Sequence, residues 1–275
     1  MTKNNLSILL CLALSALSIT AYAANDSGVK VAWGYEGSTG PANWGNLNPD
    51  FAACGNGTTQ SPVNISNKVV NGENELSIYY QADPLVVVDD GDTTLRIGKT
   101  QTVIKDGHGL QVNFPTKFEK EIIKLSGREY QLLQFHMHTP GENKLHGKSF
   151  PLELHFVHQG RNGTVAVIGV FVRTGEANPV LQKIIDHIPD EIGVAKTIEG
   201  EKINPRDLIP MGRKYYTFMG SLTTPPCSEG LRWIVMQDSI TASAEQIEKI
   251  KAAAHGANAR PIQPLNDRKV IYTKH

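Results

Sequence analysis

Two segments of the chain alternate between apolar and polar side chains with a period of two. In residues 132–138, one set of positions carries Leu133, Phe135 and Met137, and the positions between them carry Gln134, His136 and His138. Successive side chains of a β-strand point to opposite faces of its sheet. The segment is therefore predicted to be a strand with a buried apolar face and an opposite face that carries two imidazoles.

The second segment, residues 151–158, repeats this pattern. Leu152, Leu154 and Phe156 are expected on the buried face, and Glu153, His155 and Val157 on the opposite face. His158 has the parity of the buried face, so it is not expected to join His155. Antiparallel pairing of the two strands would bring His136, His138 and His155 together.

Three imidazoles on one face of a sheet predict a zinc site. Zinc binds histidine nitrogen readily, and three protein ligands with one open position are typical of a catalytic site. Gln134 and Glu153 each precede a ligand by two residues on its own face. They are expected to accept a hydrogen bond from the ligand's other nitrogen, which fixes the direction of the ring. The alternative is that these histidines only form the solvated face of a strand.

The rest of the pattern predicts one β-rich domain. Short strands broken by turn residues run from about residue 76 to 172, for example at 85–89, 94–97 and 111–114, with hairpins that turn at 126–128 and 160–163. Two short helices are expected at the periphery, one at 179–188 and one from Ser243 to about Ala254, where Ser243 and Gln246 form a capping box. The chemistry must therefore lie on the sheet.

The first 23 residues have the pattern of a signal peptide. Lys3 is followed by the apolar run Leu6–Ile19 and by Ala21-Tyr22-Ala23, a small-x-small cleavage site. The run is shorter than the ~20 apolar residues of a comfortable membrane span. We expect residues 1–23 to be removed, which leaves 24–275 as a periplasmic or secreted domain outside the membrane. An uncleaved anchor is the alternative.

The charges of the chain balance, with 27 Lys and Arg against 27 Asp and Glu. This balance argues against nucleic acid or an anionic membrane surface as a partner.

Once the signal peptide is removed, Cys54 and Cys227 are the cysteines that remain. An even pair in an exported chain predicts a disulfide, and two unpaired buried thiols are the alternative.

Further motifs occur in order along almost the whole chain. They are Trp33-Gly34-Tyr35, Gln60-Ser61-Pro62-Val63-Asn64-Ile65, Ser221-Leu222-Thr223-Thr224-Pro225-Pro226-Cys227, and Arg260-Pro261 with Gln263-Pro264-Leu265-Asn266. With the two histidine strands they resemble the α-class carbonic anhydrases, and the signal peptide and cysteines resemble the bacterial exported branch. The resemblance implies a mainly β (α+β) domain with a central, twisted, mostly antiparallel sheet of about ten strands and short peripheral helices. It also implies zinc-dependent, reversible hydration of carbon dioxide to bicarbonate and a proton.

The resemblance assigns roles to further residues by position. Thr223 would orient the nucleophile while Glu142 accepts its hydroxyl proton in a hydrogen bond, and His108 would shuttle the proton to solvent. Tyr35 would belong to a water network. Substrate would lie against an apolar slot formed by Val157, Val167, Leu222, Thr224, Leu231 and Trp233.

The chain departs from the family pattern in two places. Gly141-Glu142-Asn143 stands where Ser-Glu-His is usual, and Phe218 stands where tyrosine is frequent. Both would change hydrogen bonds around the site without removing a ligand.

Two alternatives to a carbonic anhydrase are a non-catalytic binding protein of the same family and a zinc hydrolase that acts on esters. Bacterial relatives are often dimers, so the resemblance also suggests a homodimer.

Overall fold

The computed structural model describes residues 32–66, 68–84, 102–105, 109–114, 120–190, 192, 195–196 and 200–274. The predicted signal peptide, the strands expected at 85–89 and 94–97, and His108 lie outside these residues. The described residues belong to one compact unit. Within this part of the chain, no helix is long and apolar enough to cross a membrane.

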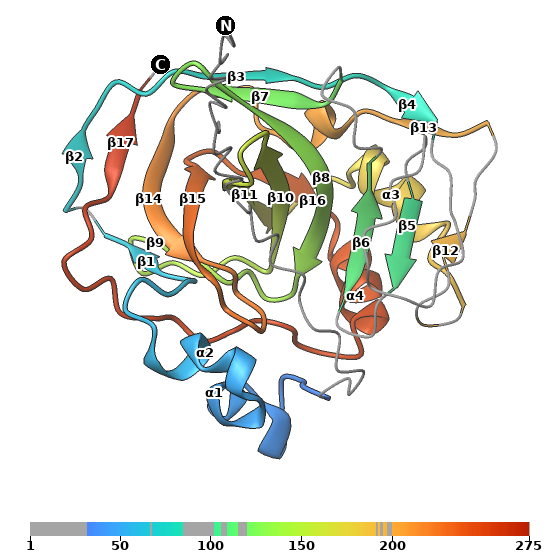
Figure 1. Cartoon of the computed structure of the whole chain (residues 1–275). Helices are drawn as coiled ribbons and strands as arrows, with labels where there is room; N and C mark the ends of the chain where they lie inside the picture. Colours follow the sequence, from blue (N-terminus) through green and yellow to red (C-terminus); the bar gives the residue numbers. More distant parts are fainter. Residues whose placement is uncertain are drawn as a thin grey trace, which may run out of the picture. The chain divides into compact units, whose positions relative to one another are not determined.

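One large sheet organises this unit (Figure 1). Its main path runs through ten strands in the order β12 (Ala195–Lys196), β5 (Thr102–Lys105), β6 (Leu110–Asn113), β8 (Arg128–His138), β10 (Leu152–Gly160), β11 (Val165–Thr174), β15 (Glu229–Met236), β14 (Tyr215–Ser221), β17 (Ile271–Thr273) and β2 (Val70–Asn71). Three more strands pair at its sides, namely β3 (Leu76–Tyr79), β7 (Ile122–Leu125) and β16 (Ile240–Ala242). Most neighbours are antiparallel, while β11 pairs β15 and β16, and β17 pairs β2, in parallel. The predicted mainly β fold with a mostly antiparallel sheet is confirmed.

Both predicted hairpins are present. β7 and β8 are joined at Ser126 and Gly127, which both have positive φ angles, as the tight turns of β-hairpins require. β10 and β11 are joined around Gly163, whose N–H donates to the carbonyl of Gly160. Two short ladders lie outside the large sheet, and they pair β1 (Asn64–Ile65) with β9 (Lys144–Leu145) and β4 (Asp83–Pro84) with β13 (Lys202–Ile203).

Helices are short and lie beside the sheet (Figure 1). α4 (Ala244–Ala253) begins with the predicted capping box of Ser243 and Gln246. α3 (Pro179–Ile185) is capped by Asn178 and ends three residues earlier than expected. The remaining helical turns are η1 (Gly37–Thr39), α1 (Trp44–Leu47), η2 (Pro49–Phe51), α2 (Ala53–Asn56) and η3 (Pro205–Leu208).

The sheet carries apolar side chains on both faces. On one face, Phe135 and Met137 of β8 and Leu152, Leu154 and Phe156 of β10 join the larger apolar cluster, which we call the main core. One predicted member is wrong: Leu132, rather than Leu133, packs into it. The reason is a β-bulge, because the register steps from Gln134↔Val157 to Leu132↔His158 and leaves one extra residue in β8. The alternation expected from the sequence therefore holds only from Gln134 onward.

Candidate metal centre

Strand register brings the three predicted ligands together. β8 and β10 pair antiparallel with His136 directly opposite His155, and His138 opposite Glu153. The ring centroids of the three histidines lie 4.7–5.3 Å apart. One nitrogen from each ring lies within 4.8 Å of the others. This spacing suits a single ion bound by all three rings.

Each ring is held through its other nitrogen. His136 Nδ1 lies 2.8 Å from Gln134 Oε1, His138 Nδ1 lies 2.7 Å from the carbonyl oxygen of Asn258, and His155 Nε2 lies 3.1 Å from Glu153 Oε1. All three partners are acceptors, so these nitrogens must carry the ring protons. The lone pairs of His136 Nε2, His138 Nε2 and His155 Nδ1 are then available to a metal. A set of three neutral imidazole donors fits Zn²⁺.

Burial sets the charge of the site. It lowers the pKa of His136 well below its usual value, with His138 and His155 adding to the effect, so this imidazole is neutral. Burial raises the pKa of Glu153, but the neighbouring His155 and hydrogen bonds from His155 and Asn143 oppose it, and the pKa lies below its usual value. Glu153 is therefore an ionised partner for the His155 ring.

Glu142 lies beside the metal-facing nitrogens, and the Thr223 side chain is hydrogen-bonded to it. Glu142 Oε2 is 3.5 Å from His138 Nε2 and 3.8 Å from His155 Nδ1, and its Oε1 accepts the backbone N–H of Arg260 at 2.8 Å. Burial raises the pKa of Glu142 to about 7, against the lowering effects of His155, the Arg260 N–H and a hydrogen bond from the Thr223 side chain. Thr223 and Glu142 are both buried. The structure thus places this predicted pair in contact at the metal centre.

The predicted apolar slot forms one cluster next to the histidines. Val157, Val167, Leu222, Leu231 and Trp233 all belong to the second apolar cluster, on the face opposite the main core. Val157, Val167 and Trp233 are paired across the neighbouring strands β10, β11 and β15. Val157 lies two residues beyond His155 on β10 and therefore on the same face of the sheet. The ring of Trp233 lies 4.8 Å from the ring of His155. Thr224 follows in the adjoining turn, where its carbonyl accepts the N–H of Cys227.

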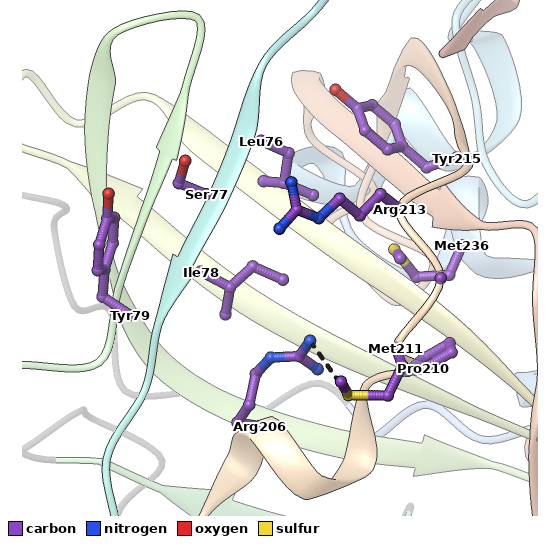
Figure 2. A pocket seen from close by; sticks show the side chains of 11 residues that line it. Leu76, Ser77, Ile78, Tyr79, Arg206, Pro210, Met211, Arg213, Tyr215 and Met236 are labelled. Atoms are coloured by element: carbon purple, nitrogen blue, oxygen red, sulfur yellow. Dashed lines mark hydrogen bonds between the residues drawn. The ribbon is translucent and has the colours of Figure 1, made fainter. Parts of the chain in front are cut away.

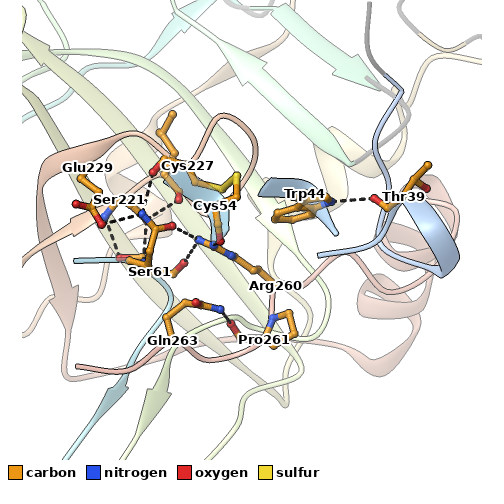
Figure 3. The surroundings of a disulfide bond; sticks show 12 residues. Thr39, Trp44, Cys54, Ser61, Ser221, Cys227, Glu229, Arg260, Pro261 and Gln263 are labelled. Atoms are coloured by element: carbon orange, nitrogen blue, oxygen red, sulfur yellow. Dashed lines mark hydrogen bonds between the residues drawn. A yellow bond between two sulfur atoms is a disulfide. The ribbon is translucent and has the colours of Figure 1, made fainter. Parts of the chain in front are cut away.

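The predicted disulfide is present between Cys54 and Cys227, whose Cα atoms are 5.0 Å apart (Figure 3). Its sulfurs pack with Trp44, and the rings of Trp33 and Tyr35 contact this aromatic cluster. Tyr35 is therefore placed at the disulfide end of the molecule, with ring centroids 5.7 Å from both tryptophans.

Arg260 connects the disulfide to the metal centre. Its guanidinium donates to the carbonyls of Cys54 and Ser61 and to Gln60 Oε1 at 2.7–2.9 Å, while its backbone N–H holds Glu142. The sequence showed Arg260 only as part of a motif, because nothing local indicates that this arginine is buried. Asn258 was missed for the same reason, because it reaches His138 from 120 residues away. Asn143 was expected to change hydrogen bonds around the site, but the sequence did not show that its partner is Glu153.

Two other histidines among the described residues stand apart from the metal centre. His146 is exposed, and His158 is buried against Tyr80 on the opposite side of the sheet. A cavity of about 280 Å³ also lies elsewhere, between β3 and the segment 206–213, and contains none of the predicted site residues (Figure 2). Gln111, on β6, is directly opposite His136 and donates to Asn113 Oδ1.

Known proteins share both the sequence and the fold of this chain. The family model for eukaryotic-type carbonic anhydrase matches residues 39–274. A carbonic anhydrase of Pectobacterium atrosepticum is 40% identical over 94% of this chain and 97% of its own length. A carbonic anhydrase of Nostoc sp. is 39% identical over 88% of this chain and 86% of its own.

The solved structure of an α-carbonic anhydrase from Thermovibrio ammonificans in complex with the inhibitor sulfanilamide aligns with a TM-score of 0.78. It is 38% identical, and the alignment covers 88% of this chain and all of that one. The match extends over nearly every described element, and the three histidines converge as a zinc site requires. The chain belongs to the eukaryotic-type, or α-class, carbonic anhydrase family.

Proposed function

We propose that this protein is a zinc enzyme that hydrates carbon dioxide reversibly to bicarbonate and a proton. The observation that carries the proposal is the position of three inward-facing imidazole nitrogens beside both an apolar cluster and the Thr223–Glu142 pair. When bound, zinc would acidify a water molecule and so supply a nucleophile at neutral pH, a chemistry for which carbonic anhydrases are the standard example.

Thr223 and Glu142 would orient that nucleophile. Since the Thr223 hydroxyl donates its hydrogen to the buried carboxylate, its oxygen lone pairs remain to accept a hydrogen bond from the attacking group. A nucleophile held in one direction has fewer unproductive orientations, which lowers the entropic part of the barrier.

Carbon dioxide carries no charge and has no strong hydrogen-bonding group, so an apolar surface beside the nucleophile would suit its binding. Val157, Val167, Leu222, Leu231 and Trp233 offer this surface, and Thr224 borders it in the following turn. Tyr35, which packs with Trp33 and Trp44, would belong to a water network. His108 would carry the released proton to solvent.

The test is zinc analysis together with stopped-flow hydration of carbon dioxide by the zinc-loaded protein. One zinc per chain and sulfonamide-sensitive hydration are expected. His155→Asn should lose both. His146→Asn is the matched control and should keep both, because His146 is exposed and at a positive φ that asparagine tolerates. Bound zinc without hydration would favour the non-catalytic binding protein, and ester cleavage alone would favour the hydrolase.

His108 has its own test. His108→Ala should slow turnover in weak buffer, because the released proton then lacks a nearby acceptor. Added imidazole should accept the proton instead and restore turnover. Failure of imidazole to restore turnover would remove His108 from the proton pathway.

We infer from the signal-peptide pattern that residues 1–23 are cleaved and that 24–275 form the exported catalytic domain, periplasmic or secreted. The disulfide supports an oxidising location. N-terminal sequencing of the exported protein tests the cleavage site, and analytical ultracentrifugation tests the suggested homodimer.

A further inference from the structure

A buried amide lies behind the carboxylate that holds His155. We propose that Asn143 is a positioning residue: it holds the Glu153 carboxylate in the one orientation that directs His155 Nδ1 at the metal, and so slows zinc release. The inference rests on the proposed zinc site, but it does not depend on carbon dioxide being the substrate.

Asn143 donates to both oxygens of Glu153. Its backbone N–H lies 2.8 Å from Glu153 Oε2, and its side-chain Nδ2 lies 2.8 Å from Glu153 Oε1. Both residues have no exposed surface. A carboxylate held by two donors from one residue is fixed in position and in rotation, as in other two-point contacts.

The orientation of the Asn143 amide is itself determined. Its Oδ1 accepts the backbone N–H of Val63 at 3.0 Å, so its amino group must face Glu153. Val63 immediately precedes β1, and β1 pairs in parallel with β9, which begins one residue after Asn143. Two backbone segments thus hold the amide, and it has little freedom to rotate.

Glu153 transmits this position to the ligand. Its Oε1 lies 3.1 Å from His155 Nε2, the nitrogen opposite the one that faces the metal. Space around the carboxylate is tight, since a Cβ added at Gly169 would lie 3.1 Å from Glu153 Oε1, and one added at Gly141 would lie 3.1 Å from Glu153 Cβ. Gly141 and Asn143, which both depart from the usual family residues, therefore border the same side chain.

The test measures zinc release to an excess of dipicolinate, without any activity assay. Removing the direct partner of a metal-bound histidine costs about 10- to 100-fold in metal affinity, so Glu153→Ala should speed release by about that factor. Asn143→Ala acts one step further from the metal and should speed release by about 3- to 10-fold. Asn143→Asp keeps the shape but turns an oxygen toward Glu153, so it should release zinc faster than Asn143→Ala.

A double-mutant cycle separates this role from a general effect on folding. If Asn143 acts through Glu153, the double variant Asn143→Ala/Glu153→Ala should release zinc at the same rate as Glu153→Ala alone. Asn178→Ala is the control, since it removes a side chain that accepts two backbone N–H groups at the start of α3. It should lower stability without changing zinc release.

Several outcomes would overturn the proposal. They are wild-type zinc release in Asn143→Ala, slower release from Asn143→Asp than from Asn143→Ala, or additive effects in the cycle. Should Asn143→Ala fail to fold, the nearly isosteric Asn143→Asp and the hydroxyl donor in Asn143→Ser take its place, with the serine variant expected between wild type and Asn143→Asp. Wild-type protein that binds zinc but does not hydrate carbon dioxide would refute the proposed function and leave this inference standing.

Discussion

At the scale of single residues, the buried histidines His155 and His158 lie on the same strand but on opposite faces of the sheet. His155 points to the metal centre, whereas His158 lies on the main-core side, stacked on Tyr80 and hydrogen-bonded to its hydroxyl. Its Nδ1 lies 3.3 Å from the carbonyl of Ala166. A neutral ring satisfies both contacts, with the proton on Nδ1 and the Tyr80 hydroxyl donating to Nε2.

His158 should make the protein sensitive to acid. Burial lowers its pKa from 6.5 to about 3, so between these values the unfolded chain binds a proton that the folded chain excludes. Stability is then lost as the pH falls below about 6.5, by about 1.4 kcal/mol per pH unit from this group. The test is urea unfolding of the metal-free proteins from pH 4.5 to 7. Below about pH 6.5, the free energy of unfolding of His158→Gln should fall less steeply with falling pH than that of wild type, by that amount per pH unit. Parallel curves for wild type and His158→Gln would contradict this, and His146→Asn should keep the wild-type slope.

Thr223 should affect catalysis without affecting metal binding. Thr223→Val keeps the shape but removes the hydroxyl that Glu142 accepts, so the nucleophile loses its orientation. We expect kcat/KM for hydration to fall by about 10²-fold, the order seen when one positioning contact is lost, with zinc content unchanged. Thr217→Val is the control, because Thr217 is also a buried threonine but lies on β14, and it should keep wild-type rates. Equal rates for the two variants would exclude Thr223 from the mechanism.

At the scale of elements, strands carry the site and helices support the sheet. α4 illustrates the second role, because Ile247 and Ile250 pack into the main core while Gln246 bonds both to the start of its own helix and to Asn178 at the start of α3. One capping box therefore joins two helix ends.

Loss of that cap should destabilise the protein without changing its chemistry. Ser243→Ala removes the oxygen that accepts the Gln246 N–H, and the free energy of unfolding should fall by about 1 kcal/mol. Urea unfolding measures this, with hydration activity as the second readout. Ser149→Ala, in an exposed loop, should change stability by less than about 0.5 kcal/mol. A cap variant as stable as wild type would show that packing alone sets this helix end.

At the scale of the whole molecule, the disulfide joins positions 173 residues apart. Closing so long a loop removes about 5 kcal/mol of chain entropy from the unfolded state in the loop-closure model. Cys54→Ser should therefore lower the melting temperature markedly. Zinc content should remain, because the ligands lie on β8 and β10 and neither strand contains one of the two cysteines. Identical melting temperatures for oxidised and reduced wild-type protein would show that the bond does not stabilise the fold.

Local patterns in the chain predict which residues can meet on the sheet. A strand has a period of two, so the alternation in 134–138 and 152–157 placed three histidines, Gln134 and Glu153 on one face before any pairing was known. The alternation misled at Leu133, because a bulge inserts one residue without a local signal.

The contacts that hold those residues in place come from the folded arrangement of several segments. Asn143 holds Glu153, Asn258 holds the His138 ring, and Arg260 holds Glu142. Asn258 lies 120 residues beyond the histidine that it orients. Alternation along a strand follows from local backbone geometry and can be read from the chain. A hydrogen bond between distant segments depends on how the whole sheet and its loops close, and no local pattern records it.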